Sequence, residues 1–145
     1  MRWPTLATCL LASIIAAPAA AITDYVGNME QFQFAAKVAN ASKSCQRLGY
    51  KVNEADAFAF VTGTVTSAIE DGMDVTLANQ LATQAIKDET ERQQFLLRQV
   101  KEAQGKSAVI AEAATERFLS TWQANCDAIA ADPRASRFFE KPKKH

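Results

Sequence analysis

The sequence predicts an all-α protein: a small helical bundle of three to five helices, stapled by one disulfide bond. Three observations predict this fold. The chain of 145 residues contains only five glycines and four prolines, and its many alanines and glutamines favour helix. Apolar residues recur at helical spacing between the few glycines. Two cysteines, Cys45 and Cys126, fall on these apolar faces.

Residues 1–21 have the layout of a cleaved secretory signal peptide. Arg2 supplies a positive charge, an apolar run spans residues 6–17, and small residues precede the expected cleavage after Ala21. An uncleaved membrane anchor is disfavoured because the run is much shorter than the roughly 20 residues that cross a bilayer. A lipid anchor on Cys9 is disfavoured because most of the apolar segment follows that cysteine. We therefore expect an exported protein, periplasmic or secreted.

The remaining chain is expected to form one helical domain over residues 22–139 and a basic, disordered tail over residues 140–145. Between Ile22 and Pro133, fifteen acidic residues outnumber ten basic ones, whereas the last twelve residues add five basic ones. Nucleic-acid binding needs concentrated lysine and arginine to contact phosphates. The acidic body therefore argues against a nucleic-acid partner.

The first helix is predicted from about Asn28 to Leu48. Its apolar stripe consists of Phe34, Val38, Ala41, Cys45 and Leu48. Gly49 suits the left-handed backbone position that ends a helix.

The second helix is predicted to begin after Asn53, whose side chain caps free backbone amides, and to end near Asp71, with Gly72 beyond. The β-branched residues between Phe58 and Ile69 favour a strand. Helix is preferred because no partner strand is evident and because apolar residues follow helical spacing at Phe58, Val61, Val65 and Ile69.

A row of small residues spaced four apart also follows this second helix: Ala55, Ala59, Gly63 and Ser67. Such a row lets two helices approach closely. We expect it to pack inside the bundle, with contact to a second copy or to a partner helix as the alternative.

The third helix is predicted to be capped by Asp74 or Thr76 and to carry Leu77, Leu81 and Ala85 on its inner face. Residues 87–94 contain no apolar residue, so the helix either continues through solvent or restarts at Thr90. The next apolar residues are predicted to return to the core: Phe95, Leu96, Leu97 and Val100.

Ser107 is predicted to cap the fourth helix. Its apolar stripe consists of Ile110, Ala114, Phe118, Trp122 and Cys126. Asp132 and Pro133 then predict the start of a short last helix that includes Phe138 and Phe139.

Cys45 and Cys126 are left as a pair once Cys9 is removed with the signal peptide. An even number of cysteines in an oxidising compartment predicts a disulfide, which requires the two Cα atoms to approach to about 5.5 Å. A redox-active or metal-binding pair is disfavoured because the chain has no C-x-x-C motif and His145 is its only histidine.

We find no catalytic centre in the sequence and expect neither an enzyme, a cofactor nor a bound metal. Catalysis by a nucleophile and a general base usually requires a histidine, and His145 lies in the tail. Two groups of carboxylates are interpreted as a solvated helix face and as turn chemistry: Glu112 with Glu116, and Glu70 with Asp71 and Asp74. An enzyme that uses these carboxylates alone ranks third among the hypotheses.

The leading functional hypothesis is binding of another macromolecule, most simply a protein of the envelope or extracellular space, in an accessory, chaperone-like or inhibitor role. The polar segment 87–94 is one candidate surface, and the C-terminal segment is the other: Phe138, Phe139, Lys141, Lys143 and Lys144. The same aromatic and basic residues suit contact with a membrane surface. The purely structural interpretation is that the two phenylalanines cover the core at a frayed chain end.

The alternative hypothesis is a carrier for a small apolar ligand held between the helices. Its pocket would be lined by Phe34, Phe58, Phe118 and Trp122. The oligomeric state is left open.

Overall fold

The computed structural model describes residues 19–143, with side chains from Gly27 onward. In this part of the chain four helices and two short strands follow one another: α1 (Ala19–Arg47), β1 (Lys51–Val52), α2 (Glu54–Glu70), α3 (Val75–Gln104), α4 (Ala108–Ala131) and β2 (Phe139–Glu140). The predicted small all-α bundle is confirmed. The predicted signal peptide lies outside the described residues up to position 18.

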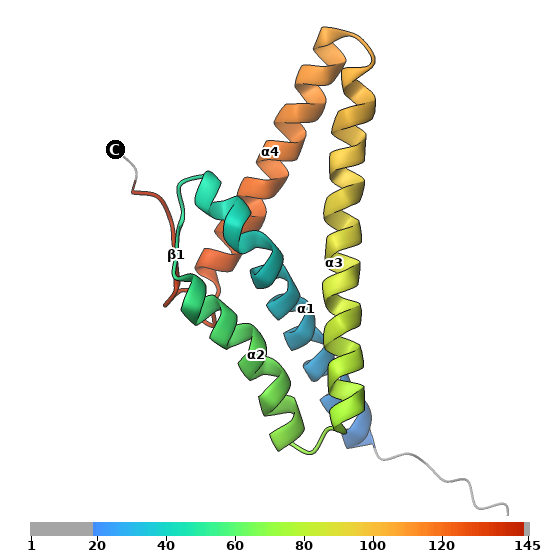
Figure 1. The fold of residues 1–145 in the computed structure, drawn as a ribbon, viewed down its shortest axis with the longest axis vertical. Coiled ribbons are helices and arrows are strands. Elements are labelled where there is room, and N and C mark those ends of the chain that lie inside the picture. The colour runs from blue at the N-terminus through green and yellow to red at the C-terminus, as the bar shows by residue number, and fades with distance from the viewer. Residues whose placement is uncertain (1–18, 144–145) are drawn as a thin grey trace, which may run out of the picture.

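Helix α1 is the centre of the bundle, since it contacts α2, α3 and α4. Beyond the end of α1, the later part of α3 and the first part of α4 run side by side as a hairpin (Figure 1). This hairpin projects past the rest of the molecule. We call residues 95–121 the outer hairpin.

Side-chain caps set the beginnings of three helices, as predicted. The backbone N–H groups of Asp56, Leu77 and Ile110 each donate to a cap residue three positions earlier. These cap residues are Asn53, Asp74 and Ser107. At the other ends of α1 and α2, Gly49 and Gly72 adopt positive φ values of 88° and 102°, which glycine reaches without steric cost.

Two clusters of buried residues form the core. The first surrounds the ends of α1 and α4 and includes Val38, Cys45, Ala57, Cys126, Ile129, Phe138 and Phe139. The second joins α1, α2 and the first half of α3 through Phe32, Ala36, Ala68, Ala78, Leu81 and Ala85. Neither cluster contains a residue between Ala85 and Cys126, so the core ends before the outer hairpin begins.

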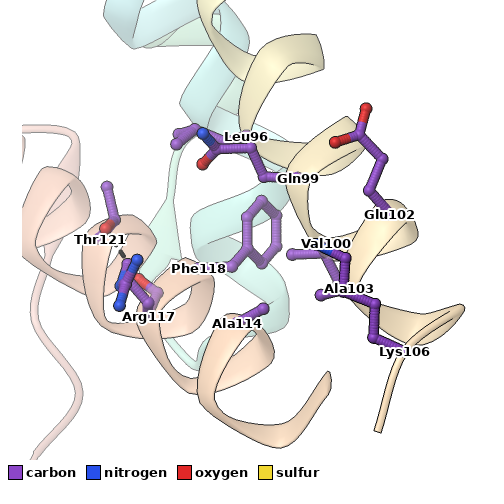
Figure 2. Close-up of a pocket in the computed structure, with 10 residues that line it drawn as sticks. All are labelled: Leu96, Gln99, Val100, Glu102, Ala103, Lys106, Ala114, Arg117, Phe118 and Thr121. Atoms are coloured by element: carbon purple, nitrogen blue, oxygen red, sulfur yellow. Dashed lines mark hydrogen bonds between the residues drawn. The ribbon is translucent and has the colours of Figure 1, made fainter. Parts of the chain in front are cut away.

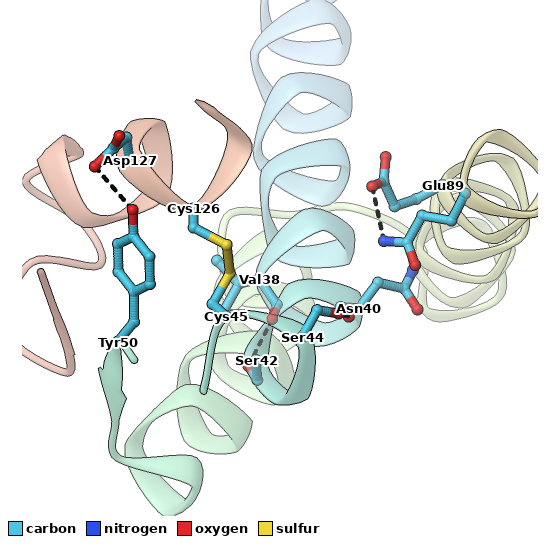
Figure 3. The surroundings of a disulfide bond; sticks show 10 residues. Val38, Asn40, Ser42, Ser44, Cys45, Tyr50, Glu89, Cys126 and Asp127 are labelled. Atoms are coloured by element: carbon cyan, nitrogen blue, oxygen red, sulfur yellow. Dashed lines mark hydrogen bonds between the residues drawn. A yellow bond between two sulfur atoms is a disulfide. The ribbon is translucent and has the colours of Figure 1, made fainter. Parts of the chain in front are cut away.

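Cys45 and Cys126 are bonded, as the sequence predicts (Figure 3). Their sulfur atoms lie 2.01 Å apart and their Cα atoms 5.7 Å apart. Both side chains are fully buried. The bond therefore joins the last turns of α1 and α4 inside the first core cluster.

The predicted short last helix is wrong. After α4 the backbone makes turns in which the N–H groups of Ala135 and Ser136 donate to the carbonyl of Asp132. The chain then enters β2, which pairs antiparallel with β1 through Lys51↔Glu140 and Val52↔Phe139. Glu140 therefore pairs with β1 and does not begin a free tail, in contrast to the prediction for residues 140–145.

Helix α3 passes through the polar segment 87–94 without a break, so the predicted alternative of a restart at Thr90 is excluded. Glu89 is buried there and its carboxylate accepts hydrogen bonds from the Arg92 guanidinium at 2.6 and 2.9 Å and from Gln93 at 3.2 Å. These bonds satisfy the buried charge, which would otherwise be costly to desolvate. The Arg92 pKa is raised, chiefly by its hydrogen bond to Glu89.

The segment Phe58–Ile69 is helical, as preferred. Of its predicted inner face, Val61, Val65 and Ile69 are partly buried against the core, whereas Phe58 is not. The residues that α2 buries are Ala57, Thr64 and Ala68. Phe58 is 70% exposed because it lies one position away from this face. The small-residue row is also misplaced: Ala55, Ala59 and Ser67 are exposed, so it does not pack inside the bundle.

Candidate functional site

Among residues 27–143, most of the exposed large apolar side chains lie on the outer hairpin. Their exposed fractions are 52% for Phe95, 48% for Leu97, 76% for Val109, 48% for Ile110 and 46% for Leu119. The prediction that Phe95 and Leu97 return to the core is therefore wrong. The physical reason is that α1 ends at Arg47, and at this height α3 has only α4 beside it (Figure 1).

A hollow of about 280 Å³ lies between the two helices of the outer hairpin. Figure 2 shows the Phe118 ring pointing from α4 toward α3, where it forms the floor of this hollow. Apolar side chains from both helices surround the ring: Leu96, Val100, Ala103 and Ala114. The Phe118 ring also packs on Trp122, with the ring centroids 4.7 Å apart. The hollow is therefore apolar at its base.

Polar and charged side chains form the rim of the hollow. They are Gln99, Glu102, Lys106, Arg117 and Thr121. Lys106 and Arg117 have no ion-pair partner in the part of the chain that the structure describes. An apolar side chain that carries a neighbouring carboxylate would find complementary chemistry here.

Phe138 and Phe139 are only 2% and 1% exposed, so the interpretation that they cover the core is confirmed and they do not belong to the candidate C-terminal surface. They belong to the first core cluster, because β2 pairs with β1 and draws this segment onto the body. Lys141 and Lys143 are both exposed, and the Lys141 ammonium lies 3.0 Å from the Asp127 carboxylate. Lys144 and His145 lie outside the described residues.

The arginine that follows α4 also serves the interior of the molecule. Arg134 donates hydrogen bonds of 2.8 and 2.9 Å to Asp132, and its guanidinium carbon lies 3.8 Å from the centre of the Phe34 ring. The hydrogen bond from Arg134 is the main cause that lowers the pKa of Asp132 and raises that of Arg134. These contacts fix the turn after α4.

Tyr50 and Asp127 form a second anchor beside the disulfide (Figure 3). The Tyr50 hydroxyl donates a hydrogen bond of 2.9 Å to Asp127. Burial, followed by this hydrogen bond and the carboxylate charge, raises the pKa of Tyr50 to about 12. We interpret this pair as structural, because it holds the β1 segment on α4.

The four aromatic residues predicted to line one ligand pocket do not meet. Phe34 packs edge-on against Phe60, whereas Phe118 of the outer hairpin packs on Trp122, the next residue of α4 beyond it. Phe58 borders a different groove of about 570 Å³, between α1 and α2, together with Ala39, Asn40, Ser42, Lys43, Glu54, Ala57 and Val61. The pocket proposed from sequence is therefore not formed.

The carboxylates singled out in the sequence are exposed. Glu112 and Glu116 lie on the outside of α4, and Glu70, Asp71 and Asp74 surround the turn between α2 and α3. Within residues 19–143 no three potential ligands gather in a way that could hold a metal ion. None of the helices described here has the length and apolarity required to span a bilayer.

Sequence reasoning missed Val109 and Leu119 as surface residues. Both lie off the periodic stripe of α4, and that offset was the available signal.

Comparison with family models, with curated proteins and with solved structures finds no match to this chain.

Proposed function

We propose that this chain is an exported, non-enzymatic protein that binds another protein through the outer hairpin, in an accessory, chaperone-like or inhibitor role. One observation carries the proposal: the outer hairpin projects beyond the core and exposes Phe95 and Ile110 on the side that contains the apolar hollow. Single exposed apolar residues are ordinary, but a group of them on one element is typical of an interaction site.

The side of the hairpin that contains the hollow supports this role best. Phe95 lies four residues before Gln99, and Ile110 lies seven residues before Arg117, so each shares a helix face with a residue of the rim. Phe95, the hollow and Ile110 therefore form one apolar surface, and its charged rim carries two bases, Lys106 and Arg117, and one acid, Glu102. Such a surface suits an apolar side chain of a partner with an acidic neighbour.

Export is part of the proposal, and two features support it. The first residues have the layout of a signal peptide, and the buried Cys45–Cys126 disulfide suits an oxidising compartment. The partner is accordingly expected to be a protein of the envelope or the extracellular space.

The test is a pull-down from the native envelope or secretome with the mature protein and two variants. Phe95→Asp combined with Ile110→Asp places charges on the hollow side, whereas Phe58→Asp is a matched control on the exposed face of α2. A specific protein should copurify with the wild type and with the control, and should be lost with the double variant. Equal recovery with all three proteins would exclude the outer hairpin as the binding surface.

A second candidate function is a carrier for a small apolar ligand, favoured by the groove of about 570 Å³ between α1 and α2. Its apolar lining comes from Ala39, Ala57, Phe58 and Val61. Native mass spectrometry of the purified protein tests it: a bound small molecule that is lost in Phe58→Asp supports the carrier, and an unliganded mass counts against it.

A further inference from the structure

The outer hairpin has a second side, which faces away from the hollow. Gln99 of α3 and Arg117 of α4 line the hollow, and Leu97 and Leu119 each lie two residues from one of them. Residues two apart on an α-helix point about 200° apart, because the helix has 3.6 residues per turn. Leu97 and Leu119 therefore both project from the side opposite the hollow. We call this the leucine side.

Each helix of the hairpin contributes one exposed leucine to the leucine side. About half of the surface of Leu97 and of Leu119 is exposed. Ile86, also exposed, lies eleven residues before Leu97, which is three helical turns on the same face of α3. Trp122 is partly buried one turn after Leu119. In the outer hairpin, α3 and α4 have only each other as neighbours within the described part of the chain (Figure 1), so no described element covers Leu97 or Leu119.

Charges of opposite sign border the two leucines. Lys101 lies four residues after Leu97 on α3, and Glu112 lies seven residues before Leu119 on α4. Each pair shares one helix face. Among residues 27–143, neither Lys101 nor Glu112 has an ion-pair partner. The leucine side thus presents a cation on one helix and an anion on the other.

We infer that the leucine side binds the leucine side of a second copy of this chain. A two-fold contact places one surface patch against itself. With the two-fold axis parallel to the hairpin, α3 of one copy lies on α4 of the other. The tip of the hairpin lies between Gly105, which ends α3, and Ser107, which begins α4. At 1.5 Å per residue, Lys101 lies about 6 Å from Gly105 along α3, and Glu112 lies about 8 Å from Ser107 along α4. Lys101 therefore meets Glu112 of the second copy at nearly the same height, and the symmetry makes this pair twice.

The charges also select this arrangement over the other two-fold stacking. If α3 lay on α3, the two hairpins would run antiparallel, and Lys101 would face α3 of the second copy instead of Glu112 on α4, so both opposite-charge pairs would be lost. The inference goes beyond the proposed function because it uses the opposite side of the hairpin. A second copy on the leucine side leaves the hollow free for a different protein.

The test measures the mass of the oxidised mature protein in solution across a range of concentrations, by light scattering or sedimentation. The wild type should approach the mass of a dimer. Lys101→Glu and Glu112→Lys should each weaken the dimer by about tenfold or more, because each substitution places two like-charge pairs in the contact. An equimolar mixture of these two variants should restore the dimer as a heterodimer, which also shows that both are folded.

Arg117→Glu is the matched control, since it reverses a charge on the hollow side and should leave the dimer intact. Leu97→Asp should abolish the dimer. A wild type that is monomeric throughout overturns the inference, as does a dimer that survives Leu97→Asp or a mixture that fails to restore association. None of these outcomes changes the pull-down with Phe95→Asp and Ile110→Asp, so the two proposals fail separately.

Discussion

The sulfur of Cys45, in the last turn of α1, is bonded to that of Cys126, near the end of α4, across 81 residues of sequence. This bond holds the base of α4 against the centre of the bundle. The first half of α4 and the last half of α3 lie beyond it and beyond both core clusters. The protein is therefore a tightly held body with a projecting helical hairpin.

Removal of the disulfide should lower the free energy of unfolding substantially. Closing a loop of 81 residues stabilises the native state by about 4 kcal/mol in the chain-entropy model. Urea unfolding of the wild type with and without reductant, and of Cys45→Ala combined with Cys126→Ala, measures this loss. The reductant should have no effect on the double variant. A loss below about 1 kcal/mol would contradict the structural role of the bond.

Two phenylalanines should respond very differently to truncation. Phe139 is fully buried in the first core cluster, so Phe139→Ala should cost about 3–5 kcal/mol of stability. Phe58 is mostly exposed, so Phe58→Ala should cost less than about 0.5 kcal/mol. Chemical denaturation of both variants checks the difference. Similar costs would mean that the C-terminal segment does not pack on the body.

The features predicted correctly from sequence are local ones. A cap such as Ser107 or Asp74 bonds an amide three residues away, so its signal lies within a short stretch of sequence. Periodicity likewise indicates that Cys45 and Cys126 face inward. A strict spacing of four does not keep residues on one helix face, because each step of four residues turns the helix by about 40°. Ile110 lies sixteen residues before Cys126 in the predicted stripe, so it points about 160° away from Cys126 and is exposed.

The features missed from sequence depend on contacts between distant segments. The pairing of β1 with β2 involves only two residues from each strand, which leaves no alternating pattern to detect. This pairing buries Phe138 and Phe139, so these two residues do not form the surface that was predicted for the C-terminal segment. The hairpin surface was missed because exposure of Phe95 and Leu97 follows from the lengths of the neighbouring helices.

The Tyr50–Asp127 pair should make stability fall at alkaline pH. The folded protein raises the Tyr50 pKa from 10.0 to about 12, so the protonated hydroxyl is favoured in the native state. This contribution is fully present below pH 10 and is lost as the pH rises toward 12. At about 1.4 kcal/mol per pKa unit, the loss reaches up to about 3 kcal/mol.

Unfolding of the wild type and of Tyr50→Phe across this pH range measures the effect. The variant lacks the titrating hydroxyl, so the difference in stability between the two proteins should shrink from pH 10 to 12. A difference that stays constant over this range would show that Tyr50 ionises as it does in the unfolded chain.

The Asp132–Arg134 pair should contribute stability at neutral pH and not in acid. The pKa of Asp132 is lowered in the folded protein, chiefly by the hydrogen bond from Arg134. The contribution is therefore present above the ordinary carboxyl pKa and is lost as the pH falls through the lowered value. Both side chains are partly solvated, so solvent screening limits the contribution to about 1 kcal/mol.

Asp132→Asn and Arg134→Gln should each destabilise the protein at neutral pH, and thermal unfolding of the two variants checks this. The loss of stability that each variant shows relative to the wild type should be smaller in strong acid, where the Asp132 carboxyl of the wild type is protonated. If the cost of Asp132→Asn is the same in acid as at neutral pH, the charge of this carboxylate does not stabilise the turn.

The most direct test of the central claim is site-specific photocrosslinking of the protein in its native compartment. A photoreactive phenylalanine analogue replaces Ile110 on the hollow side of the outer hairpin or, as a control, the exposed Phe58 on α2. We expect a discrete crosslink to another protein from position 110 and none from position 58. No crosslink from position 110, or the same products from both positions, would contradict a protein-binding role for the outer hairpin.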